Sequence, residues 1–191
     1  MMKNPWPNPK AKQAVNERFW PHLFRKDLEH RITQAKNEGR NVQLGEMTVR
    51  IGAGVNSSIK AGRYDKTLKL VDALTSDPSA HLLFAHPEVG EQVTEGLLKA
   101  CVVGVTYSGF GRLEAKNLVA KSIWLLQQGG KGEYVLNLAR ENSEKPHIVP
   151  AAMIAMAQNN DWEAVRQLLK NDNIQDGHLE LGRQLLASRT K

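Results

Sequence analysis

The sequence has little of two features that stabilise or anchor many proteins: cysteine and long apolar runs. Its 191 residues include a single cysteine, Cys101, which rules out an internal disulfide and is typical of a reducing compartment. No uninterrupted apolar run approaches the ~18 residues of a membrane-spanning helix. The N-terminal stretch MMKNPWPNPKAKQAVN also lacks the apolar segment of a secretory signal. We therefore expect a cytoplasmic protein with no membrane span.

The motifs of several enzyme classes are also missing. Residues 52–54, Gly-Ala-Gly, lack the third glycine of a dinucleotide-binding fingerprint, because Ser57 stands in its place. No Cys-x-x-Cys or His-Glu-x-x-His pattern exists, and His81 and His86 are five apart, whereas a helical metal pair needs a spacing of three or four. Cys101 lies in an apolar stripe, which predicts a buried thiol. The sequence therefore predicts no catalytic residue, no metal site and no cofactor, and it favours a binding protein over an enzyme.

Helical periodicity dominates what is present. Apolar residues recur three and four apart between Pro87 and Gln128, in two segments separated by Gly109 and Gly111. Two apolar helices joined by a short glycine turn predict a central αα-hairpin, and its apolar character places it at the centre of the core. From Lys131 onward, shorter amphipathic segments with short breaks predict a C-terminal array of helical hairpins.

One stretch alternates between apolar and polar residues instead. The alternation runs from residue 42 to residue 51, and Gly45-Glu46 within it suits a two-residue turn. We predict one short β-hairpin near residues 42–51, followed by a loop from Gly52 to Gly62. The expected fold is therefore mainly α, a multi-helix domain in which this hairpin is the only β-structure.

Positive charge is concentrated in the first third of the chain. The net charge is +6, but residues 1–66 hold 13 Lys or Arg against 6 Asp or Glu, and residues 67–191 hold 13 against 14. We expect residues 1–66 to form a basic N-terminal segment of helices and the β-hairpin. This segment should pack on a helical body of residues 67–191, within one folding unit.

A localised excess of positive charge attracts an acidic protein surface, nucleic acid or an anionic membrane, although it also occurs on ordinary solvated surfaces. We expect a helical protein–protein interaction protein, an adaptor or regulator, that binds an acidic partner. Nucleic-acid binding through phosphate contacts is the alternative. Asp27 and Glu29 dilute the basic field of the helix predicted from Pro21 to Glu38, which favours the protein partner. The candidate binding residues are Arg18, Arg25, Lys26, Arg31, Lys36, Arg40, Arg50, Lys60, Arg63 and Lys66.

Two short stretches resemble known families. Residues 25–30, Arg-Lys-Asp-Leu-Glu-His, resemble the short motif of HEPN ribonucleases. That resemblance implies that Arg25 binds phosphate and that His30 takes part in cleaving RNA. The alternative, which we favour, is that both are surface residues on a basic helix face.

Residues 150–171 resemble the helix-turn-helix of one ankyrin repeat, without its threonine-proline-leucine-histidine opening. We find no second copy at a period of about 33 residues, so the stretch predicts a helical hairpin and no particular family.

Overall fold

The computed structural model describes residues 46–77, 80–86 and 89–189, with side chains from residue 49 onward. The chain divides into two compact units, Met1–Thr48 and Val49–Lys191. Nearly all of the first unit lies outside the described residues, and so do the helices predicted before residue 40. The second unit contains the rest of the chain, including residues 49–66 of the predicted basic segment.

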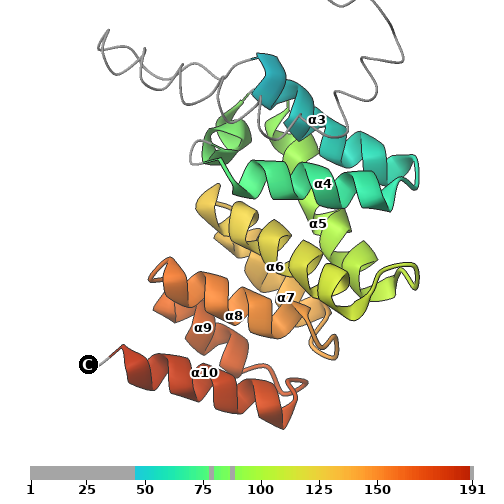
Figure 1. Cartoon of the computed structure of the whole chain (residues 1–191). Coiled ribbons are helices and arrows are strands. Elements are labelled where there is room, and N and C mark those ends of the chain that lie inside the picture. The colour runs from blue at the N-terminus through green and yellow to red at the C-terminus, as the bar shows by residue number, and fades with distance from the viewer. Residues whose placement is uncertain (1–45, 78–79, 87–88, 190–191) are drawn as a thin grey trace, which may run out of the picture. The chain divides into compact units, whose positions relative to one another are not determined.

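The described residues form helices and no strand, so the prediction of a mainly helical fold is confirmed. Figure 1 shows the helices following one another from the start of α3 to the C-terminus. In chain order they are α3 (Glu46–Lys60), α4 (Tyr64–Thr75), the 3-10 helix η1 (Ala80–Ala85), α5 (Gly90–Thr106), α6 (Arg112–Gln128), α7 (Gly132–Glu141), α8 (Ile148–Gln158), α9 (Trp162–Leu169) and α10 (Asp176–Ser188).

Helix α3 occupies the place where we predicted the end of the β-hairpin and the loop after it. The alternation of residues 42–51 competes with a second pattern, in which Ile51, Val55 and Ile59 recur four apart. All three are buried, so the helical pattern prevails. The predictions of a strand at residues 46–51 and of a loop at residues 52–62 are wrong. Residues 42–45 lie outside the described residues.

The glycines of α3 suggested a loop in the sequence, but in the structure they allow this helix to pack closely. A Cβ atom on Gly52 would lie 2.9 Å from Cγ2 of Val93, and one on Gly54 would lie 3.3 Å from Cδ1 of Leu70. Hydrogen in place of a side chain therefore lets α3 approach its neighbours closely, which outweighs the low helix propensity of glycine.

Helices α5 and α6 make the most extensive contact between any two elements of the second unit. Gly104 on α5 allows close approach, since a Cβ atom there would lie 2.7 Å from Cγ2 of Val119. Cys101 is fully buried in the same region, as predicted. Burial raises the pKa of its thiol to about 12, so the thiolate that nucleophilic chemistry requires does not form near neutral pH.

The hairpins α6–α7 and α8–α9 are closed by two turns of the same kind, 30 residues apart. Gly130 and Asn160 both adopt a left-handed backbone, with φ of 72° and 60°. Each donates its N–H to the carbonyl three residues earlier, and each following residue, Lys131 or Asp161, donates to the carbonyl five residues earlier. This pair of bonds is the Schellman motif, which satisfies carbonyls that a helix C-terminus leaves free. The turn of the α8–α9 hairpin therefore recurs between α6 and α7, at a displacement of 30 residues rather than about 33.

The turn between α3 and α4 is a third copy of the same motif. Gly62 has φ of 65° and donates to the carbonyl of Ile59, and Arg63 donates to the carbonyl of Ser58. The sequences of the three hairpins share few residues, so hydrogen bonding and backbone conformation reveal the repetition where residue identity does not.

The later helices stack in two rows. Contacts run from α4 to α6, from α6 to α8 and from α8 to α10, and a second row joins α7 to α9. Figure 1 shows α4, α6, α8 and α10 one below another, with α5, α7 and α9 behind them. Helices of both rows bury apolar side chains, among them Leu126, Val135 and Met156.

Candidate functional site

The ten predicted binding residues divide at the boundary of the described part of the chain. Four of them, Arg50, Lys60, Arg63 and Lys66, are described, and all four are exposed. The other six, Arg18, Arg25, Lys26, Arg31, Lys36 and Arg40, lie outside the described residues. The HEPN-like pair, Arg25 and His30, lies outside them as well.

The α3–α4 turn brings three of the four together. Lys60 ends α3, Arg63 occupies the N-cap position of α4, and Lys66 lies in the first turn of α4. Arg50 stands ten residues before Lys60 on α3, which corresponds to about 15 Å along a helix. We name the set Lys60, Arg63 and Lys66 the basic turn.

Lys60 is partly neutralised by an acid on α5. Its Nζ lies 3.8 Å from Oε2 of Glu95, which also pairs with Lys99 and accepts a 2.5 Å hydrogen bond from Asn56 Nδ2. The hydrogen bond from Lys99 is the main cause that lowers the pKa of Glu95, with help from Asn56 and from the charge of Lys60. Glu95 is therefore a fixed negative charge beside the basic turn.

Arg63 and Lys66 have no such partner. Neither forms a hydrogen bond or ion pair through its side chain with any residue of the described part. Their charges face solvent and remain available to a ligand.

An aromatic cluster adjoins the basic turn. The ring of Tyr64, the first residue of α4, meets the ring of Tyr107 edge-on at 4.6 Å between centroids, and Tyr107 meets Phe110 at 5.0 Å. Tyr107 remains 41% exposed, which is unusual for a large ring with two aromatic neighbours. The cluster places the partly exposed Tyr107 ring against Tyr64, the residue that follows Arg63 in the chain.

Gly109 makes this cluster possible. A Cβ atom on Gly109 would lie 2.4 Å from Cζ and Oη of Tyr107, so the tyrosine ring folds over the glycine backbone. Our predicted binding residues include none of these aromatic residues, so the sequence analysis missed Tyr107 and Phe110. The signal was present in Tyr-Ser-Gly-Phe-Gly, where glycines separate two aromatic residues in a short turn.

Other chemistry is not visible in this part of the chain. Within residues 46–77, 80–86 and 89–189, no group of three or more His, Cys, Asp or Glu side chains is placed to hold a metal ion. No helix in the same ranges combines the length and the apolar character needed to cross a membrane. The described part of the chain is therefore an all-helical stack, with three cationic residues at the α3–α4 turn and an aromatic cluster that includes Tyr64.

The chain matches no family model, no curated protein and no solved structure.

Proposed function

We propose that the chain is a helical protein–protein interaction protein, of the adaptor or regulatory kind, that binds an acidic partner through the basic residues of its first third. One observation carries the proposal: Arg63 and Lys66 are exposed with no side-chain partner among the described residues, and Tyr64, which lies between them in the chain, contacts the partly exposed ring of Tyr107. Binding hot spots commonly combine an aromatic anchor with charges at the rim.

The charges and the ring have different roles in this proposal. The cations steer an acidic partner toward the turn and select it over basic proteins. The Tyr107 ring gives the partner an apolar surface to cover, and burial of apolar surface favours association.

Nucleic acid is the alternative ligand, and the same ring favours it, because bases stack on exposed aromatic side chains beside cations. The acid Glu95 beside Lys60 opposes phosphates and carboxylates alike, so it does not separate the two ligands. Our preference for a protein rests on the acids among the basic residues of the first third, Asp27 and Glu29.

A labelled acidic peptide of aspartate and glutamate tests the proposal by fluorescence anisotropy on the full chain. Reversal of two charges, Arg63→Glu with Lys66→Glu, should weaken binding about tenfold, because each exposed pair contributes ~0.2–1 kcal/mol and reversal replaces attraction by repulsion. Tyr107→Ala should weaken it independently of salt. The control Arg183→Glu changes an exposed cation of α10 and should leave binding unchanged.

Nucleic acid is tested alongside, with mixed-sequence DNA and RNA at ~50 mM and ~200 mM salt, a span over which six to ten phosphate contacts change affinity ~10³-fold or more. Tight, salt-sensitive nucleic-acid binding that is lost in the double variant would replace our proposal by the alternative. Acidic-peptide binding that ignores both charge reversals would also defeat it.

A further inference from the structure

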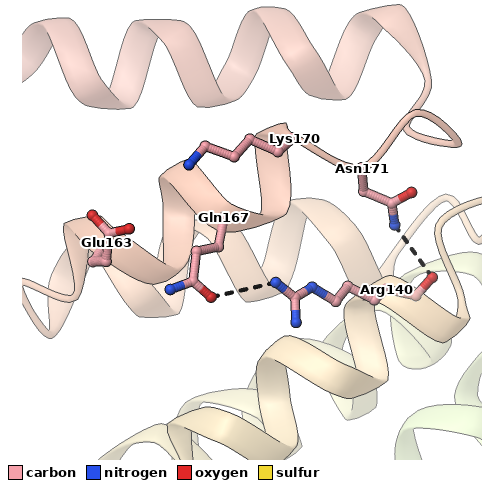
Figure 2. Close-up of a pocket in the computed structure, with 5 residues that line it drawn as sticks. All are labelled: Arg140, Glu163, Gln167, Lys170 and Asn171. Atoms are coloured by element: carbon pink, nitrogen blue, oxygen red, sulfur yellow. Dashed lines mark hydrogen bonds between the residues drawn. The ribbon is translucent and has the colours of Figure 1, made fainter.

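A second candidate surface lies between α7 and α9, away from the basic turn. Two adjoining hollows of about 550 Å³ and 330 Å³ open there, and they share Arg140, Glu163 and Gln167 as lining residues. Figure 2 shows five side chains that line the larger hollow, from α7, α9 and the segment after α9, with Arg140 directed toward Gln167. We name this feature the α7–α9 groove.

The 30-residue repeat gives the groove a regular lining. Positions 30 residues apart carry the same kind of side chain in three pairs. Each pair has one member on each side of the groove. The pairs are acids, Glu133 and Glu163; amides, Asn137 and Gln167; and cations, Arg140 and Lys170. An acid, an amide and a cation therefore follow one another at spacings of four and three residues along α7 and along α9 with its C-cap Lys170.

The two helices are held side by side at both ends. At their C-terminal ends, Asn171 Nδ2 donates to the backbone carbonyl of Arg140 at 3.5 Å, and Gln175 Nε2 donates to that of Glu144 at 3.1 Å. At their N-terminal ends, a Cβ atom on Gly132 would lie 3.5 Å from Oδ2 of Asp161. The three rows are therefore kept in register.

Most of the lining is free to bind. The side chains of Glu133, Asn137 and Lys170 form no hydrogen bond or ion pair with residues of the described part. Arg140 Nη2 donates to Gln167 Oε1 at a weak 3.3 Å across the groove, a bond drawn in Figure 2. Glu163 pairs only with its own helix neighbour Arg166, at 3.2 Å.

We propose that the α7–α9 groove binds an extended peptide segment whose successive side chains alternate between basic and acidic. The segment crosses the two helices with its backbone over the amide row. Amides both donate and accept, so Asn137 and Gln167 suit the N–H and C=O groups of a peptide backbone. In an extended chain successive side chains point to opposite sides, one set toward the acid row and the other toward the cation row.

The spacing of the rows fits this ligand. At 1.5 Å of rise per residue, the acid row lies about 6 Å from the amide row and the cation row lies ~4.5 Å on its other side. The Cα atoms of each set therefore span about 10 Å along the helix, and an extended segment that crosses between the acids and the cations directs alternate side chains to either side. A nucleic acid fits poorly, because the acid row would face its phosphates.

The inference stands apart from the proposed function, since it uses none of the basic turn. The probe is a labelled peptide of alternating lysine and glutamate, about eight residues and ~27 Å long when extended. The comparison peptide has the same composition with its lysines and glutamates in two blocks. We expect the alternating peptide to bind the full chain at least about fivefold more tightly than the block peptide, because only alternation satisfies both rows.

Variants test whether the amide row carries the binding. Asn137→Ala with Gln167→Ala should weaken alternating-peptide binding by roughly tenfold, the effect of losing two hydrogen bonds of ~0.5–1.5 kcal/mol each. The matched control Gln158→Ala removes an exposed amide of α8 outside the groove and should change nothing. The variant Arg63→Glu with Lys66→Glu should also leave this binding intact, so that failure of one proposal is distinguished from failure of the other.

Three results would overturn the inference. They are equal affinity for the two peptides, alternating-peptide binding that the double amide variant leaves unchanged in a folded protein, and the absence of any binding at millimolar peptide. Binding of single-stranded RNA that depends on Asn137 and Gln167 would assign the groove to nucleic acid instead.

Discussion

At the residue scale, the array depends on three residues with a left-handed backbone: Gly62, Gly130 and Asn160. Residues other than glycine adopt this conformation at an energetic cost, which is smaller for asparagine than for most. The sequence shows Gly130 as a break after α6 and Asn160 as part of a polar turn. Only the matching hydrogen bonds show that both close the same motif.

Gly130→Ala measures the cost of that conformation directly. A Cβ atom at Gly130 would meet nothing within 4 Å, so the substitution adds backbone strain and no clash. We expect the free energy of unfolding to fall by about 1–2 kcal/mol. Urea titration followed by circular dichroism measures it, with the m-value held constant as the sign that only stability has changed.

The control is Gly177→Ala on α10, where a Cβ atom is equally unobstructed and φ is not left-handed. This change should leave stability unchanged or raise it slightly, because alanine favours helix over glycine. Equal effects of the two substitutions would show that the left-handed turn is not formed in solution.

At the element scale, the sequence predicts helices well where apolar residues keep a helical period over several turns. The segments that became α5 and α6 are such a case, because the stripes containing Leu97 and Ile123 are long and end at glycines. The prediction failed at α3, where a short alternation and two glycines favoured a strand and a loop. Tertiary packing favours the helix there, since Gly52 and Gly54 allow close contact with Val93 and Leu70.

The contact between α3 and α5 is the element-scale feature that the sequence hides most completely. A Cβ atom on Gly96 of α5 would lie 2.9 Å from the backbone nitrogen of Asn56 and 3.0 Å from its Cα. Backbone atoms cannot rotate away as a flexible side chain can. Gly96→Ala must therefore push α3 and α5 apart.

We expect Gly96→Ala to destabilise the protein by about 1–3 kcal/mol, the usual range for overpacking a close contact. Chemical denaturation of the variant beside wild type and Gly177→Ala provides the measurement. A variant as stable as wild type would mean that α3 does not pack on α5 at Gly96.

At the scale of the whole second unit, extensive contacts join only helices that lie within two places of each other in the series α4 to α10. Stability in such a stack comes from contacts between neighbours, as in repeat proteins, and can differ along it. The same locality limits what the sequence reveals of binding sites. Charge composition pointed to Lys60, Arg63 and Lys66, but Tyr107 joins them only through folding, and the α7–α9 groove follows from a repeat that residue identity conceals.

The last prediction concerns α10, which ends the stack. Gly182 is its only buried residue, whereas most residues of α8 are buried. Few buried contacts mean a low free energy of local opening. Amide hydrogens of α10 should therefore exchange with solvent faster than those of α8, as measured by hydrogen exchange with mass spectrometry.

Gly182→Leu should widen the difference between α10 and the interior. Even a Cβ atom at Gly182 would lie 2.5 Å from Cδ2 of Leu169, so a larger side chain must displace α10 from α9. Because contacts are local, amide hydrogen exchange should become faster in α10 and in α9, which packs against it. The amides of α5 and α6 should keep their wild-type protection from exchange. Uniformly faster exchange across all helices would instead show that the second unit opens as one cooperative body.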